Sequence, residues 1–362
     1  MLNGRIVTPA GVVDGSVAVA DGLIAAVEPG DAGTDVIVPG FVDIHTHGGG
    51  GHAFTLGDAE AVRAGAAFHL GHGTTTLVAS LVSSPFELMR TATAAYAPLF
   101  HEGVIAGIHF EGPYLSAVRC GAQNPAYLRD PSADEIAEVI KLGEGAVRMM
   151  TIAPERAGAL DAIRQLVAAG VVAAIGHTDA TWEQTRAGVA AGATVGTHVF
   201  NGMRPPHHRE PGPVFGLLDA APVVCEFIAD GIHLHDGTLA FAAGVTGPAR
   251  AALITDAMDA AGMADGRYEL GGQAVLVADG VARLERDGAI AGSTLTMDAA
   301  LRRAVGAGIT LADAVTMASA TPARAIGLTD RGAIAPGLRA DLVVLAEDLT
   351  VKRVMRGGAW VS

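Results

Sequence analysis

Residues 40–52 read GFVDIHTHGGGGH, an apolar run that carries two histidines and is followed at once by glycines. The run has the length and composition of a buried strand. Because residues i and i+2 of a strand lie on one face, His45 and His47 are expected to point the same way. The glycines do not form a GxxxxGK[ST] phosphate loop, and we expect them to let the backbone approach a ligand closely. The stretch thus predicts a strand that ends in a pair of imidazoles.

Further apolar runs of strand length follow along the chain, most of them separated by amphipathic segments. Together with 41–47, the strand candidates are 74–80, 104–112, 147–155, 171–178, 194–200, 223–230 and 249–258. Alternation of strand and helix favours a parallel sheet with right-handed crossovers. Eight units over this length predict an α/β fold, a (β/α)₈ TIM-like barrel at residues 40–331.

The two ends of the chain have a different pattern, of short β-runs broken by turn residues. We expect residues 1–39 and 332–362 to form one small β-sandwich domain. Residues 263–288 follow the eighth strand and read as a hairpin-rich insertion.

Composition limits the kinds of partner. The 362 residues include 24 basic and 38 acidic side chains, a net charge of −14, so neither nucleic acid nor an anionic membrane is an expected partner. Cys120 and Cys225 form no CxxC pair, and the N-terminus lacks the pattern of a signal peptide. No uncharged apolar run reaches membrane-spanning length. These features predict a cytoplasmic protein.

Titratable residues occupy the ends of most predicted strands, where barrel enzymes gather their chemistry. They are His45, His47, Glu111, His177, His198, His233 and Asp256. A single strand-end histidine is more often structural, but the coincidence of all these residues favours a metal site. Imidazole nitrogens and carboxylate oxygens suit a divalent ion, Zn²⁺ first among them.

Different strand ends suggest different roles. Glu111, His177 and His198 have the composition of a catalytic zinc site with an open position for water. Asp256 is the candidate general base, because a carboxylate there can take a proton and later return it to a leaving group. Its alternative role is to orient a histidine ligand. His45 and His47 would bind metal or be hydrogen-bonded inside the barrel.

The lysines bear on how two metal ions would be bridged. Some barrel hydrolases use a carboxylated lysine, but Lys141 lies in an amphipathic segment and Lys352 in the last β-segment, and the chain has no other lysine. Glu111 is therefore the carboxylate that would bridge two ions. A strand-end salt bridge is its alternative role.

Residues 201–212, NGMRPPHHREPG, form a cationic loop on an otherwise acidic chain. A guanidinium matches phosphate and carboxylate oxygens bidentately, so Arg209 could bind such a group or simply be solvated. His207 and His208 could assist it or be exposed. Cys120 lies in the loop after Glu111 and has no basic partner nearby in the sequence.

With these motifs in order, the chain resembles the amidohydrolase superfamily, and within it the N-acetylglucosamine-6-phosphate deacetylase family, over essentially its full length. The motifs are PGFVDIHTHG, GIHFEGPYL, IGHTDAT, GTHVFNGM, REPG, ADGIHLH, LITDAM and IAGSTLTM. The resemblance implies a distorted barrel with a terminal β-sandwich, usually in a homodimer. It implies hydrolysis of the acetamide of N-acetylglucosamine 6-phosphate to glucosamine 6-phosphate and acetate.

The resemblance also implies roles for single residues. Asp256 would be the base and acid beside a main metal bound by Glu111, His177 and His198. His233 would polarise the amide carbonyl, and Arg209 would reach the sugar phosphate of the neighbouring subunit. The residues implied for the substrate pocket are Ala122, Gln123, Asn201, Gly202, His207, Asp230, Ile290, Ala291 and Gly292, with Cys120 as a loop contact.

The chain departs from many members of that family in two places. Many family members lack one or both histidines of the HxH pair and use a single metal, whereas this chain has both, His45 and His47. Gln123 replaces a loop histidine, so phosphate binding would depend more on Arg209 with His207 or His208.

Two other functions stay open. One is another amide hydrolase on the same scaffold, such as a D-amino-acid deacylase, although the lack of a suitable lysine and the REPG loop disfavour it. The other is a catalytically silent sugar-phosphate-binding regulator, which would have no need of Asp256.

Overall fold

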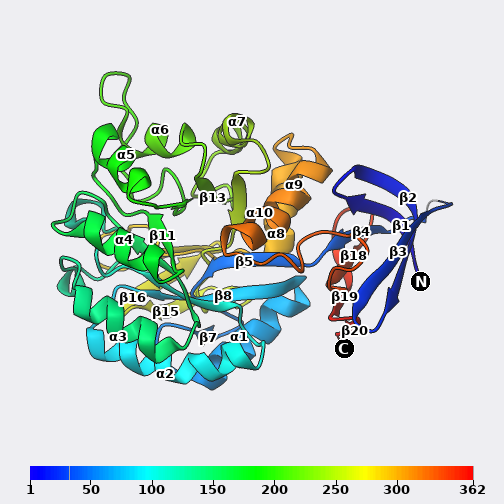
Figure 1. Ribbon diagram of the computed structural model, residues 1–362, viewed down its shortest axis with the longest axis horizontal. Helices are drawn as coiled ribbons and strands as arrows, with labels where there is room; N and C mark the ends of the chain where they lie inside the picture. The colour runs from blue at the N-terminus through cyan, green and yellow to red at the C-terminus, as the bar shows by residue number, and fades with distance from the viewer. Residues whose placement is uncertain (32, 362) are drawn as a thin grey trace.

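The computed structural model describes residues 1–31 and 33–361, and its larger sheet is an eight-stranded parallel barrel (Figure 1). Its strands follow one another in chain order around the sheet: β5 (Phe41–Thr46), β8 (Thr74–Val82), β9 (Gly107–Glu111), β10 (Val147–Ile152), β11 (Val172–Ile175), β12 (Val195–Gly196), β13 (Val224–Ile228) and β14 (Ala251–Ile254). Each coincides with a predicted strand, and the barrel prediction is confirmed.

The first and last strands, β5 and β14, meet just beyond their C-terminal ends. The Asp256 N–H donates to the His45 carbonyl at 2.9 Å, and the His47 N–H donates to the Ala257 carbonyl at 2.7 Å. Below this seam the buried Asp43 carboxylate accepts the Thr255 hydroxyl at 2.6 Å. Closing the barrel in this way brings His45, His47 and Asp256 side by side.

Helices cover the outside of the barrel. They are α1 (Ala59–Gly71), α2 (Phe86–His101), α3 (Ala133–Gly143), α4 (Ala159–Ala168), α5 (Trp182–Ala190), α6 (Gly212–Leu218), α7 (Asp236–Thr246), α8 (Met297–Gly306), α9 (Leu311–Ala318) and α10 (Ala320–Ala325). Polar caps fix several starts, such as Ser132 on α3 and the Thr181–Gln184 capping box on α5. Lys141 is exposed on α3, so it does not reach the strand ends.

A separate small β-domain is built from both ends of the chain, as predicted. It is one seven-stranded sheet in the order β20-β19-β18-β4-β1-β2-β3. Its strands are β1 (Leu2–Thr8), β2 (Gly11–Ala20), β3 (Leu23–Pro29), β4 (Val36–Pro39), β18 (Leu342–Leu345), β19 (Val351–Arg356) and β20 (Ala359–Trp360). Lys352 on β19 pairs with Asp35 at 2.6 Å, so neither lysine is near the barrel mouth.

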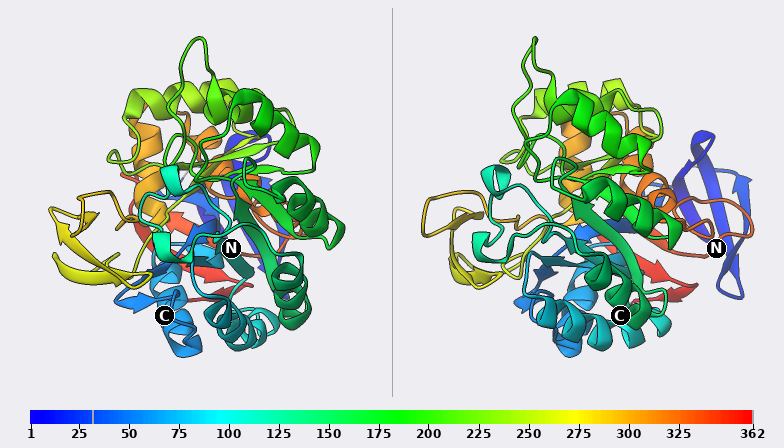
Figure 2. Two further views of the ribbon diagram at one scale, coloured as in Figure 1. Left: turned by 90° about the vertical axis from the view of Figure 1, so that its left-hand side faces the viewer. Right: turned by 60° about the vertical axis from the view of Figure 1, so that its left-hand side comes forward.

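A three-stranded antiparallel sheet follows the eighth barrel strand: β15 (Gly266–Leu270), β16 (Gln273–Ala278) and β17 (Val281–Leu284). It lies at the end of the barrel away from the β-domain (Figure 2). Its apolar face packs on Val82, Met258 and Ala291, and thereby covers one side of the barrel mouth.

Short elements follow β5 and β9. β6 (Gly48–Gly49) and β7 (His52–Ala53) form a two-stranded ribbon after β5, and 3₁₀ turns cover Ala117–Arg119 and Pro125–Tyr127. In the described ranges, no helix combines the length and the apolar character needed to cross a membrane.

Candidate active site

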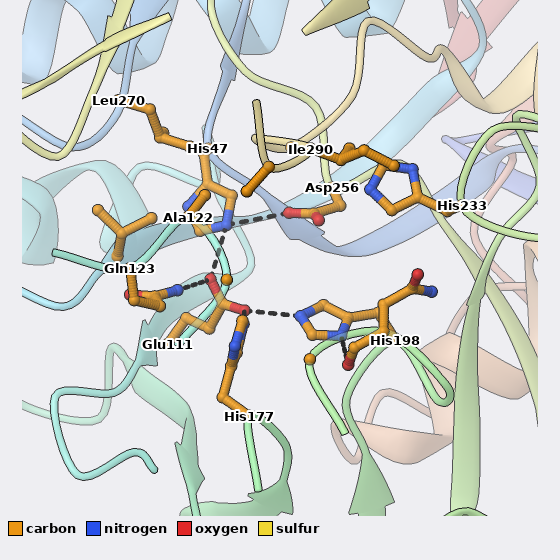
Figure 3. A pocket seen from close by; sticks show the side chains of 16 residues that line it. His47, Glu111, Ala122, Gln123, His177, His198, His233, Asp256, Leu270 and Ile290 are labelled. Atoms are coloured by element: carbon orange, nitrogen blue, oxygen red, sulfur yellow. Dashed lines mark hydrogen bonds and ion pairs between the residues drawn. The ribbon is translucent and has the colours of Figure 1, made fainter. Parts of the chain in front are cut away.

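A cavity of about 220 Å³ opens at the C-terminal ends of the barrel strands (Figure 3). Its walls come from the strand ends, the loop after β9 and the segment after β17. The predicted site residues that line it are His47, Glu111, Ala122, Gln123, His177, His198, Asn201, Gly202, His233, Asp256, Ile290 and Gly292. Residues far apart in the sequence therefore meet around one cavity.

Two groups of potential metal ligands share Glu111. One group is Glu111, His177 and His198, and the other is His45, His47, Glu111 and Asp256. Within each group the ligand atoms lie within 4.8 Å of one another, and all the residues are buried. Such an arrangement is suited to binding a divalent metal.

The histidines of both groups turn the same ring nitrogen, Nε2, toward the centre. The Nδ1–H groups of three donate to main-chain carbonyls: His47 to Ser80 (3.1 Å), His177 to Arg119 (2.9 Å) and His198 to Asn201 (3.1 Å). A carbonyl oxygen only accepts, so Nδ1 carries the proton of the neutral ring, which leaves the Nε2 lone pair to bind a metal. Lone pairs that face one another and carboxylate oxygens repel unless positive charge lies between them. The donor set therefore fits a cation.

Glu111 turns one oxygen to each group. Its Oε1 lies 2.9 Å from His177 Nε2 and 2.8 Å from His198 Nε2. Its Oε2 lies 3.2 Å from His47 Nε2 and 3.7 Å from His45 Nε2. One carboxylate thus contacts both groups, and its bridging of two ions stays a prediction.

The site stabilises positive charge among its nitrogens. Burial opposes ionisation of Glu111, but the neighbouring His45 and His177 hold its pKa well below the usual range. Burial likewise opposes a charge on His47, yet hydrogen bonds to Asp256 and Glu111 raise its pKa to about 9. The pKa of Asp256 is lowered in spite of burial, because His45 and His47 lie beside it, so its carboxylate is ionised.

Backbone strain is concentrated at the same residues. His177, His198 and Asp256 have φ of 45°, 25° and 49°, in the left-handed region that residues other than glycine rarely adopt. Just eight non-glycine residues of the described chain have positive φ, and three of them are candidate ligands or base. Such strain persists where surrounding contacts impose it, typically at functional sites.

His233 is positioned by Asp230. The Asp230 carboxylate accepts from the main-chain N–H of His233 at 2.8 Å and contacts its Nδ1 at 2.7 Å. The pKa of Asp230 is lowered against the effect of burial because His233 is its partner. With Nδ1 held, the His233 ring lines the cavity (Figure 3). Asp230 acts on the site through this ring.

Other predicted site residues do not line the cavity. His207 and Arg209 are exposed in the loop before α6, which rises away from the barrel at the top of Figure 1. Ala291 is buried against the β15–β17 sheet. Cys120 is half-buried, and its neighbour Gly121 is the residue that reaches the cavity wall. Arg209 therefore does not meet the cavity of its own chain.

Residues 36–361 match the Amidohydrolase family. The chain belongs to that family. An N-acetylglucosamine-6-phosphate deacetylase of Mycobacterium smegmatis, solved in complex with N-acetyl-D-glucosamine 6-phosphate, is 47% identical with a TM-score of 0.96, over 98% of this chain and 97% of that one. An N-acetylgalactosamine-6-phosphate deacetylase of Escherichia coli O157:H7 is 37% identical, over 99% of this chain and 98% of its own. An N-acetylglucosamine-6-phosphate deacetylase of Lysinibacillus sphaericus is 36% identical, over 89% and 84%.

Sequence reasoning missed the carboxylate that supports the ligands of this amidohydrolase site, Glu226 on β13. It is fully buried, with Oε2 3.1 Å from His45 Nδ1, and it also accepts from the main-chain N–H of His198 at 3.2 Å. The carboxylate holds a proton on His45 Nδ1 and so leaves Nε2 free, as the carbonyls do for the other three histidines. The available signal was a lone charge inside an apolar strand, VVCEFIA.

Gln123 was predicted as a substrate contact, and the structure shows that both ends of its amide are engaged with protein. Its Nε2 donates to Glu111 Oε2 at 2.7 Å, and its Oε1 accepts from the Ser83 N–H at 2.6 Å. Gln123 thus lines the cavity and also orients the carboxylate shared by both ligand groups.

Proposed function

We propose that this amidohydrolase removes the acetyl group of N-acetyl-D-glucosamine 6-phosphate, giving D-glucosamine 6-phosphate and acetate. The observation that carries the proposal is the pair of ligand groups sharing Glu111, with the ionised Asp256 beside them in a cavity. The relatives named as deacetylases of this substrate support it, because the match extends over nearly the whole chain.

A divalent ion held by these residues, Zn²⁺ first among them, would activate water and polarise the amide carbonyl. Asp256 is placed to accept the proton of that water and to return it to the departing amine. His233 turns a ring nitrogen into the cavity and, when protonated, can donate to the carbonyl oxygen. Glu226 and Gln123 keep the ligand atoms in place.

We infer that the substrate phosphate is bound across a homodimer. Arg209 and His207 are exposed and outside the cavity of their own chain. A guanidinium on a projecting loop can reach a neighbouring subunit, where it would match a phosphate bidentately. The free cysteines Cys120 and Cys225 support a reducing location such as the cytoplasm.

The epimeric sugar N-acetylgalactosamine 6-phosphate is the second candidate substrate. The Escherichia coli O157:H7 relative named for that sugar aligns with 99% of this chain at 37% identity. The two sugars differ at one hydroxyl, so the same acetamide chemistry serves both.

Acetate release tests the proposal. The purified protein would be assayed with N-acetylglucosamine 6-phosphate, N-acetylgalactosamine 6-phosphate and unphosphorylated N-acetylglucosamine, before and after chelation and re-addition of Zn²⁺. We expect metal-dependent release from the first sugar in clear preference to the third. Preference for N-acetylgalactosamine 6-phosphate would identify that sugar as the substrate. No release from any of the three sugars would indicate a binding protein without catalytic activity.

A further inference from the structure

Another cavity, of about 120 Å³, lies at the opposite end of the barrel, against the β-domain. Its walls are Thr76, Phe100, Gly103, Ile105, Ala106, Leu328, Arg331, Arg339 and Arg356. Thr76 lies near the start of β8, whereas Val82 at the end of the same strand lines the candidate active site. At about 3.3 Å per residue the two cavities are roughly 20 Å apart.

Three guanidinium groups face this small space, although the chain as a whole is acidic. Two carboxylates partly neutralise them. Asp330 pairs with Arg331 at 2.9 Å, and Asp341 pairs with Arg339 Nε at 3.0 Å. Arg356 donates to the Gly103 carbonyl and has no carboxylate partner among the described residues. One positive charge is therefore left uncompensated.

The same groups leave hydrogen-bond donors unused. Each nitrogen of Arg331 already donates one hydrogen bond, to Asp330 or to Thr76 Oγ1 (3.2 Å), so its main contribution is charge. Arg339 uses Nε on Asp341, and in the described parts of the chain its terminal nitrogens meet no acceptor. The Nε of Arg356 is buried and likewise lacks an acceptor within residues 1–31 and 33–361.

The surroundings of Arg356 disfavour its positive charge. Burial lowers its pKa, the like charge of Arg339 lowers it further, and Asp341 opposes this in part, while Arg331 adds a smaller lowering effect. A buried charged donor without an acceptor is costly, and most such groups in native proteins have a partner. An anion between Arg339 and Arg356 would accept from the unused donors and relieve the repulsion.

We propose that this cavity binds one small tetrahedral oxyanion, with inorganic phosphate as the reference ligand. Guanidinium groups bind phosphate oxygens through paired hydrogen bonds, which suits Arg339 and Arg356. A cavity of about 120 Å³ has room for one free tetrahedral ion and is clearly smaller than the candidate active site, at about 220 Å³. Arg339 and Arg356 belong to the β-domain segment, while Thr76 and Gly103 of the barrel line the same cavity, so the ion would lie at the junction of the two domains.

Thermal unfolding with inorganic phosphate tests the site, with sodium chloride at matched ionic strength as the reference. We expect a saturable rise in Tm of about 2 °C at ten times the Kd. Arg356→Gln and Arg339→Gln should abolish the rise. Arg353→Gln is the matched control, because it removes the same charge from an exposed position on the same strand. Arg209→Gln controls for phosphate bound at the candidate active site, and both controls should keep the rise.

An equal rise in all these variants, or none in the wild type, would overturn the proposal. A second measurement covers variants that fail to fold. Crystals of the wild-type protein grown with selenate should show an anomalous peak between Arg339 and Arg356, and a saturating soak without that peak would also overturn it. Acetate release is expected to be unchanged in Arg356→Gln, so this result does not depend on the proposed deacetylation.

Discussion

Glu226→Gln tests the two-ion arrangement directly. The Glu226 carboxylate is fully buried and touches both ligand groups, through His45 Nδ1 at 3.1 Å and the main-chain N–H of His198 at 3.2 Å. Glutamine keeps the shape of the side chain but removes the charge. Its amide can also present N–H to His45, which would favour the opposite tautomer and place a proton on Nε2.

The expected loss of metal affinity follows from the one hydrogen bond that changes, between residue 226 and His45 Nδ1. A hydrogen bond to a charged group contributes about 1.5–3 kcal/mol. Since about 1.4 kcal/mol is tenfold in an equilibrium constant, the affinity for the ion between His45 and His47 should fall about 10–150-fold. This agrees with the usual effect of the partners of metal ligands, about 10–100-fold. The ion at His177 and His198 should be affected less, because both rings keep their own Nδ1 acceptors.

Metal content per chain, measured after dialysis against buffers of graded free Zn²⁺, is the assay. The wild type should hold two ions over a range where Glu226→Gln holds one. Glu135→Gln is the matched control, since Glu135 is also a hydrogen-bonded carboxylate but pairs with Arg129 away from the cavity. Unchanged affinity for both ions in Glu226→Gln would refute the reasoning.

Three further changes give distinct readouts. Asp256→Asn should retain metal but lose on the order of 10³-fold in kcat for acetate release, and near-normal turnover would remove Asp256 as the base. Arg209→Ala should raise KM for the phosphorylated sugar about 10–100-fold and leave the unphosphorylated sugar unaffected, whereas equal effects on both would exclude a phosphate contact. Burial lowers the pKa of His69 to about 4 in the folded protein, so on acidification the unfolded chain binds this proton at a higher pH than the folded one. Between about pH 7 and 5 the free energy of unfolding should therefore fall by about 2 kcal/mol more in the wild type than in His69→Gln. Urea unfolding at the two pH values measures this, and parallel pH dependence would contradict it.

The barrel was predictable from sequence because each of its strands can be recognised from a short local stretch. A buried parallel strand is a short apolar run, and the last residues of each run point to the same end of the barrel. That is enough to bring Glu111, His177, His198 and Asp256 together without knowing any distance. The pairing of His45 with His47 needed only the two-residue repeat of a strand.

Partners across the barrel were not predictable in the same way. Glu226 lies on β13 and His45 on β5, and only the closed sheet brings them within 3.1 Å. A single charge in an apolar strand signals that some partner exists but does not name it. Gln123 shows the same limit, because its place near the cavity was predicted while its bond to Glu111 depends on how the loop after β9 folds back.

The glycines after His47 were expected to lie next to a ligand, but they pack against another part of the protein. None of them lines the cavity. They turn the chain against α1 instead: a Cβ on Gly49 would lie 2.6 Å from His69 Nε2, and that nitrogen donates to the Gly48 carbonyl at 2.9 Å. Gly50 donates to the Ala261 carbonyl at 2.8 Å, which ties the turn to the segment after Asp256. The glycines thus act on the site indirectly, because the turn they permit holds β5 and the end of β14 in the register that brings His45 and His47 to Asp256.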